Sequence, residues 1–161
     1  PGTLLQSHRG LRVDYSGRAV RRTISYIKDA EEMHRYRDWF GSKQHLIAKI
    51  ERSEALEDIN EIDQLCNEMW ICRGDLGAEI GLNRLAFAVQ TVTKNMRQIT
   101  HPVLMAGQVL EHMTTADTPT RSEVCHLLDL LTNGYSGFVL SDETAIGKNP
   151  LHACEAAALF K

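Results

Sequence analysis

The sequence has 161 residues, of which 43% are hydrophobic and 24% charged, and its formal net charge is −3; these values are typical of a globular protein with one buried core. No apolar run reaches the length of a membrane span and no signal peptide is recognisable at the start, so we expect no membrane association. The four cysteines form no C-x-x-C pair or zinc spacing, which favours free thiols in a reducing cytoplasm.

Basic residues are concentrated at the start of the chain. Residues 1–28 carry a net charge of +5 and the remainder carries −8. A nucleic-acid-binding arm would have this charge, but only Tyr15 and Tyr26 are interleaved as aromatics. We therefore expect a solvated or anion-facing surface and no nucleic-acid partner. Residues 1–19 receive no assignment, and because the first residue is Pro1 we expect a processed, trimmed or incomplete chain.

Short apolar runs punctuated by turn residues predict five strands. They cover residues 23–27, 46–51, 69–72, 102–106 and 137–141. Helical spacing of charges and apolar residues predicts helices over 29–40, 53–65 and 82–96, with Gly41 ending the first and a glycine-rich turn before the third. A capping box from Thr120 to Glu123, preceded by Pro119, opens a fourth helix, and a last helix begins near Leu151.

Strands that alternate with helices in this way predict repeated βα units on a parallel sheet. The strand spacing of roughly 23 to 35 residues suits a (β/α)₈ barrel of about 250 residues. Five units are too few to close eight strands. The predicted fold class is therefore α/β, a partial TIM (β/α)₈ barrel with about five βα units.

One charged pair lies at the end of the second predicted strand. Side chains alternate between the two faces of a strand, so Leu46, Ala48 and Ile50 share one face and Lys49 and Glu51 share the other. Barrel enzymes place their active sites at this end of the strands. A simple ion pair at the rim is the alternative, and taken alone it explains the two residues better.

The third predicted strand is followed by a carboxylate between glycines. Gly74, Asp75 and Gly77 follow the strand end at Cys72 and Arg73. Glycines let backbone N–H groups approach an anion, and a carboxylate can hold a hard cation. An ordinary turn containing Asp is the alternative interpretation of this segment alone.

Taken together, these segments closely resemble the pyruvate kinase family. Four motifs occur in the family's order: Ile47–Glu51, Arg73–Ile80, Pro119–Val124 and Leu140–Ala145. The segment Ser25-Tyr26-Ile27 with the helix after it is similar to the family's fourth barrel strand and helix. The resemblance covers about residues 20 to 160, so residues 20–161 are identified as the C-terminal portion of a pyruvate kinase-type barrel domain, with strands four to eight.

The resemblance implies roles for individual residues. Lys49 would neutralise charge on the phosphoryl group during transfer, as the catalytic lysine. Glu51 and Asp75 would hold Mg²⁺ or Mn²⁺, and the backbone at Gly74 and Asp75 would bind the substrate carboxylate. The substrates implied are phosphoenolpyruvate or pyruvate and ADP or ATP, in the last step of glycolysis, and a homo-oligomer is expected.

The chain departs from the family pattern at two positions. Gly107 stands where the family usually has a threonine whose hydroxyl assists protonation of the enolate, and Asp142 stands where it usually has glycine. Three parts of the family's proteins have no counterpart in this chain. They are the first three barrel strands, which carry the K⁺ site, the lid domain, and the effector domain. K⁺ is therefore expected only in the complete protein, and the isolated chain is expected to be inactive in phosphoryl transfer.

The leading functional prediction is pyruvate kinase-like phosphoryl transfer within a longer parent chain. One alternative is a Mg²⁺-dependent pyruvate or oxaloacetate lyase or decarboxylase that uses the same lysine and carboxylates to stabilise an enolate. A second alternative, from another class, is a non-catalytic remnant that binds an anionic metabolite or a partner subunit.

Overall fold

The structure, a computed structural model, describes residues 21–160, so the basic segment 1–19 lies outside the described residues. The strands are β1 (Arg21–Ile24), β2 (His45–Ile50), β3 (Glu68–Cys72), β4 (Val103–Ala106) and β5 (Gly137–Val139). The α-helices are α1 (Ala30–Phe40), α2 (Ser53–Glu57), α3 (Ile59–Leu65), α4 (Arg73–Ile80), α5 (Leu82–Asn95), α6 (Arg121–Thr132), α7 (Asp142–Ala145) and α8 (Pro150–Ala157). Short 3₁₀ helices are η1 (Met96–Gln98) and η2 (Glu111–Thr114).

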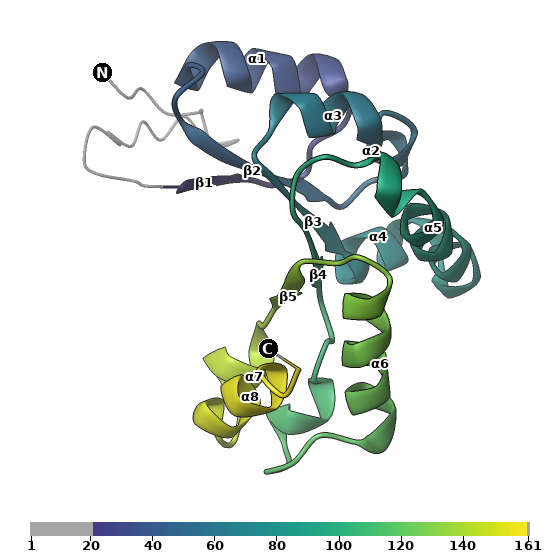
Figure 1. Cartoon of the computed structure of the whole chain (residues 1–161), viewed down its shortest axis with the longest axis vertical. Helices are drawn as coiled ribbons and strands as arrows, with labels where there is room; N and C mark the ends of the chain where they lie inside the picture. The colour runs from purple at the N-terminus through teal and green to yellow at the C-terminus, as the bar shows by residue number, and fades with distance from the viewer. Residues whose placement is uncertain (1–20, 161) are drawn as a thin grey trace.

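All five strands belong to one sheet and every neighbouring pair is parallel. The strand order is β1-β2-β3-β4-β5, the same as the order along the chain. Helices follow the strands and lie along the sheet, with α1 and α3 side by side over its first strands (Figure 1). Consecutive parallel strands in sequence order are the arrangement of a (β/α)₈ barrel. The predicted α/β class and partial barrel are confirmed.

The two faces of β2 differ as the alternation predicts. Leu46, Ala48 and Ile50 are fully buried in the hydrophobic core beneath the helices. Lys49 points to the opposite face, the side that lines the interior in a barrel, and pairs in register with Trp70 of β3. The strand therefore separates a packing face from a face that carries charge.

Helix ends follow the predicted capping chemistry. Asp29 caps α1 by accepting a hydrogen bond from the backbone N–H of Glu32, and Gly41 ends that helix at a φ of 81°. Thr120 and Glu123 form the predicted capping box at the start of α6. Helix α1 therefore begins and ends, and helix α6 begins, where the sequence indicates.

Several predicted boundaries differ from the structure; the last strand, for example, ends at Val139 rather than at residue 141. The first strand ends at Ile24 rather than at residue 27, because Tyr26 adopts a φ of 59°, which no extended strand accommodates. The helix expected over 53–65 is two helices, because Asp58 has a φ of −98° and a ψ of 15° and separates α2 from α3.

The expected glycine-rich turn after β3 is instead helix α4. Its glycines serve packing: a Cβ on Gly77 would lie 2.9 Å from Cδ2 of Leu85, so the glycine lets α4 approach α5 closely. Leu76 is fully buried beside it. Gly81, at a φ of 81°, ends the helix where the turn was expected to end.

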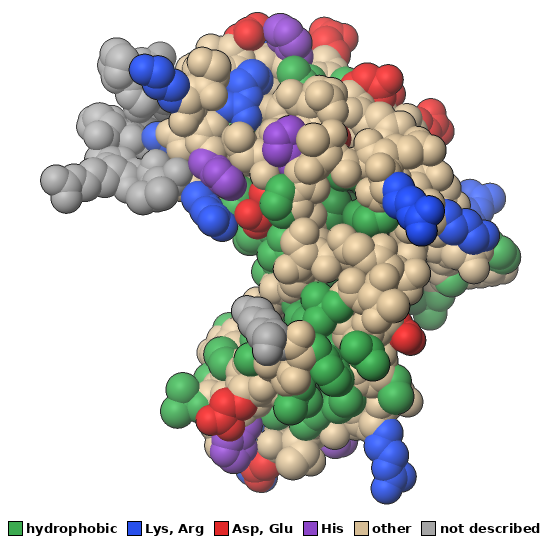
Figure 2. All heavy atoms as spheres, viewed as in Figure 1, with side chains coloured by type: hydrophobic (Ala, Val, Ile, Leu, Met, Phe, Trp, Pro, Cys, Tyr) green, Lys and Arg blue, Asp and Glu red, His purple; other side chains and the backbone are tan. Residues whose placement is uncertain are grey.

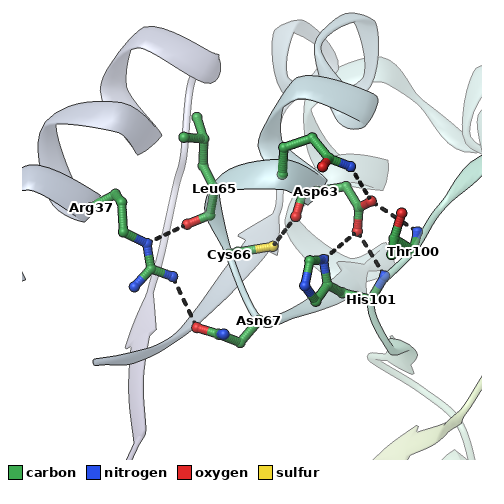
Figure 3. Close-up of polar contacts among 8 residues, drawn as sticks. Arg37, Asp63, Leu65, Cys66, Asn67, Thr100 and His101 are labelled. Atoms are coloured by element: carbon green, nitrogen blue, oxygen red, sulfur yellow. Dashed lines mark hydrogen bonds and ion pairs between the residues drawn. The ribbon is translucent and has the colours of Figure 1, made fainter. Parts of the chain in front are cut away.

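A buried carboxylate ties α3 to the segment before β4. Asp63 is fully buried, and its carboxylate accepts the backbone N–H of Thr100 at 2.9 Å and that of His101 at 3.0 Å. The His101 ring lies on the same carboxylate, with Nδ1 3.2 Å from Oδ1 (Figure 3). Because a charged acceptor satisfies two backbone donors here, this contact fixes where β4 enters the sheet.

We expect Asp63→Asn to destabilise the fold by roughly 1.5–3 kcal/mol. The substitution replaces one carboxylate oxygen with an NH₂ group, which cannot accept a hydrogen bond from a backbone N–H. Urea unfolding measures the loss. Asp38→Asn is the matched control, since Asp38 is exposed on α1 and pairs with His34 of the same helix. Equal unfolding midpoints for Asp63→Asn and the unmodified protein would contradict the assignment.

Hydrophobic side chains gather on the C-terminal part of the molecule, in the lower half of Figure 2. Exposed apolar residues there include Ile146, Leu151, Leu159 and Phe160. Exposed apolar surface and an open sheet edge promote association. Among residues 21–160, no helix is both long enough and apolar enough to cross a membrane.

We therefore expect the chain, prepared alone, to self-associate, because this apolar surface is exposed and β5, at the end of the sheet, pairs only with β4. Sedimentation velocity over a range of concentrations measures the effect. Ile146→Ser with Leu151→Ser should reduce the associated fraction. A chain that remains monomeric at the highest concentration would refute this expectation. The homo-oligomer predicted for the complete protein is a separate prediction.

Candidate active site

Charged side chains converge where β2 and β3 end. Lys49 is the penultimate residue of β2, Glu51 follows that strand directly, and Asp75 lies in the first turn of α4, directly after β3. The Lys49 Nζ atom is 2.6 Å from Oε1 of Glu51 and 3.4 Å from Oγ of Ser25. Because parallel strands end at one edge of a sheet, residues that are 24 or more positions apart in sequence meet here.

Glu51 is a buried carboxylate with only 1% of its surface exposed. Its Oε2 accepts the backbone N–H of Tyr26 at 2.6 Å. Its Oε1 lies 2.6 Å from the Lys49 ammonium, and the two charges form an ion pair. Glu51 is therefore a buried carboxylate held by one backbone donor and one ammonium group.

Asp75 is exposed, and it meets the same tyrosine. The Tyr26 hydroxyl donates to Oδ1 of Asp75 at 2.9 Å. That hydrogen bond and the negative charge of Asp75 raise the pKa of Tyr26, so the phenol stays protonated and acts as the donor. Tyr26 therefore contacts both predicted metal ligands, Glu51 through its backbone and Asp75 through its side chain.

The negatively charged groups around Lys49 stabilise its positive charge. Burial acts to lower the pKa of Lys49, but the contact with Glu51 and the negative groups around it outweigh burial, so the pKa is raised. The lysine is protonated at neutral pH and offers a fixed positive charge. Burial also raises the pKa of the neighbouring Cys72 to about 12, so this thiol is neutral and not a nucleophile.

Gly74 and Gly107 are close together beside this cluster. They line one pocket of about 430 Å³ with residues of α4, α5 and the segments after β4 and β5, including Arg73, Ser141 and Asp142. A pocket of about 520 Å³ between Lys94 and Asn133 is larger but contains none of the predicted site residues. We consider the smaller pocket the one relevant to the candidate site. It is lined both by Gly74 and by Gly107, the position where the family usually has threonine.

Gly107 is held in a left-handed backbone conformation that favours glycine. Its φ is 82°, and a Cβ there would lie 3.2 Å from the backbone N of Gly74. The Arg73 guanidinium fixes this conformation by donating to the Gly107 carbonyl at 2.6 and 3.0 Å. A threonine, which is β-branched, would be strained here unless the backbone moved.

We expect Gly107→Ala to destabilise the protein by about 1–2 kcal/mol, the cost of a side chain in the left-handed region. Gly74→Ala is the control for stability: its added Cβ meets nothing within 4 Å, and the residue is helical. Alanine should there stabilise by up to about 1 kcal/mol. Thermal unfolding measures the stability of both variants. Similar shifts of the unfolding temperature in Gly107→Ala and Gly74→Ala would contradict the strain assigned to position 107.

Three residues of this region were missed by sequence reasoning about the site. Tyr26 gave only the signal of an aromatic at a strand end. Arg73 clamps the loop after β4, and its NH1 lies 2.9 Å from Nε2 of His126. Glu143 is buried and accepts backbone N–H groups of Leu110 and Ser141, at 3.0 and 2.7 Å. No periodicity reveals such contacts, because all of them except the one between Glu143 and Ser141 join separate βα units.

The residues present fit a cation with few protein ligands. Within residues 21–160, no three His, Cys, Asp or Glu side chains gather in a way that could hold a metal ion. Two carboxylates, the buried Glu51 and the exposed Asp75, would instead supply the oxygen ligands. Mg²⁺ prefers oxygen, keeps several waters and needs only one or two carboxylates, so Glu51 and Asp75 suit it.

Similarity to known proteins is concentrated in this barrel portion. The family described as "Pyruvate kinase, barrel domain" matches residues 19–154. A pyruvate kinase of Buchnera aphidicola subsp. Baizongia pistaciae is 38% identical over 129 residues, which are 78% of this chain and 27% of that protein. For the pyruvate kinase of Thermotoga maritima the identity is 34% over 134 residues, 83% of this chain and 28% of that protein.

A plant protein is similar over the same part of the barrel. Plastidial pyruvate kinase 3, chloroplastic, of Arabidopsis thaliana is 32% identical over 133 residues, which are 81% of this chain and 23% of that protein. The chain thus spans only about a quarter of the length of the curated relatives it matches.

Proposed function

The chain belongs to the pyruvate kinase family, and from this membership we propose that it forms part of the catalytic barrel of a longer protein. That protein transfers the phosphoryl group of phosphoenolpyruvate to ADP. The bond from phosphorus to the enol oxygen breaks, a bond to the terminal ADP oxygen forms, and the enolate takes a proton at carbon to give pyruvate.

The observation that carries the proposal is the contact of Lys49 with Glu51 at 2.6 Å, close to Asp75. Phosphoryl transfer depends on positioning and on fixed positive charge near the phosphoryl oxygens. Lys49 supplies that charge, and its raised pKa keeps it protonated. The backbone at Gly74 and Asp75, at the start of α4, would bind the substrate carboxylate.

Glu51 and Asp75 would hold Mg²⁺ or Mn²⁺. A divalent cation, when bound, neutralises charge on the substrate oxygens. The two carboxylates would fix its position, and the burial of Glu51 would limit the access of bulk water to that ligand. K⁺, the nucleotide contacts and the oligomer interface belong, in this proposal, to the complete protein, and its location is the cytoplasm.

The function is tested with the complete protein by following ATP formation from phosphoenolpyruvate, ADP, Mg²⁺ and K⁺. The lyase or decarboxylase alternative has one observation in its favour, since Gly107 offers no hydroxyl. It predicts carbon–carbon cleavage, for example CO₂ release from oxaloacetate, without ATP formation. ATP formation supports the kinase, cleavage alone supports the lyase, and neither activity would support a non-catalytic remnant.

A further inference from the structure

Tyr26 is the most unusual residue beside the candidate site. Its φ of 59° is in the left-handed region, where a bulky aromatic residue is an outlier. Such a conformation is strained and persists only where the surrounding structure enforces it. Half of the Tyr26 surface is exposed, so burial of the ring does not explain the conformation.

The contacts of Tyr26 explain it better. In this conformation the backbone N–H reaches Oε2 of Glu51 at 2.6 Å, and the hydroxyl of the same residue reaches Oδ1 of Asp75 at 2.9 Å. The Arg52 guanidinium lies 5.9 Å from the ring centroid, on the ring face, where a cation–π attraction holds the ring. An extended residue at position 26 would continue β1 and would present its N–H to the sheet instead.

We propose that Tyr26 is a positioning residue of the metal site, whose backbone holds Glu51 and whose hydroxyl holds Asp75 in the orientation that receives the cation. This inference rests on the metal site proposed above. The exposed Asp75 is the ligand that most needs such support, because no surrounding packing fixes an exposed carboxylate. Partners that orient metal ligands typically contribute 10–100-fold to metal affinity.

Tyr26→Phe isolates the side-chain half of this role. Phenylalanine keeps the ring and the backbone N–H but removes the hydroxyl. We expect the dissociation constant for Mn²⁺, measured by calorimetry with the complete protein, to rise about tenfold. The control is Tyr36→Phe on α1, which removes a hydroxyl that contacts Glu32 of the same helix and should leave Mn²⁺ affinity unchanged.

A second readout reports the hydrogen bond itself. With ¹³C at the Cζ of tyrosine, we expect the Tyr26 resonance, assigned by its loss in Tyr26→Phe, to shift when Mg²⁺ is added. The same addition should leave Tyr36 unmoved. In Asp75→Asn the Mg²⁺-dependent shift of Tyr26 should vanish, because the hydroxyl senses the metal through Asp75.

Several outcomes overturn the proposal. Mn²⁺ affinity equal in Tyr26→Phe and the unmodified protein, with an unchanged unfolding midpoint, removes Tyr26 from the site while leaving the site itself intact. A tenfold loss accompanied by the same loss in Tyr36→Phe would indicate a general structural effect. If the unmodified protein binds no Mn²⁺, both this inference and the proposed metal site fail.

Discussion

Lys49→Met should lower the rate of phosphoryl transfer by the complete protein about 10²–10³-fold, or roughly 3–4 kcal/mol in the transition state. Methionine keeps most of the length of the side chain but removes the charge that lies 2.6 Å from Glu51. The substitution also leaves Glu51 buried without its ion-pair partner. Steady-state kinetics with phosphoenolpyruvate and ADP measure the loss, which we expect in kcat.

Proton exchange distinguishes loss of this charge from general damage. Deuterium wash-in at the pyruvate methyl group reports enolate formation, and we expect Lys49→Met to suppress it less than phosphoryl transfer. Lys28→Met is the control, because Lys28 is exposed and lies 3.8 Å from Asp29. Wild-type transfer rates in Lys49→Met would show that the role assigned to this lysine is wrong.

Glu51→Gln and Asp75→Asn should each weaken Mn²⁺ binding by about 100-fold or more. Each substitution removes the negative charge of a metal ligand. Losing only a hydrogen-bond partner of a ligand lowers metal affinity 10–100-fold, so we expect the loss of a ligand charge to cost more. Both replacements are nearly isosteric, so the fold should persist. Calorimetry or proton relaxation of Mn²⁺ solutions measures affinity.

Glu54→Gln is the matched control for both variants, since Glu54 is an exposed carboxylate on α2. Its Mn²⁺ affinity should equal that of the unmodified protein. Unchanged affinity in both Glu51→Gln and Asp75→Asn would rule out the site. A loss in Glu51→Gln alone would leave Glu51 as a ligand and exclude Asp75.

The fold was predictable from local patterns because its strands and helices follow them closely. The alternation in β2 fixed which residues pack and which carry charge, and the capping box at Thr120 fixed the start of α6. Helix α4 was not predictable from its glycines. Gly77 signals a turn locally, yet its actual role is close contact with Leu85, a neighbour in space.

The candidate site shows the same division. Lys49 and Glu51 are two residues apart, so strand geometry places them on one face. The contacts of Tyr26 depend on a φ of 59°, which a tyrosine rarely adopts and no sequence pattern indicates. Gly107 looked like a missing hydroxyl, but its φ of 82° and its approach to Gly74 give it a conformational role as well.

The most direct test of the account is to locate bound Mn²⁺ by anomalous scattering in crystals of the complete protein. The account predicts one peak within coordination distance, about 2.1 Å, of a carboxylate oxygen of Glu51 and of one of Asp75. A peak coordinated by other residues, or the absence of a peak in crystals grown with saturating Mn²⁺, would contradict it.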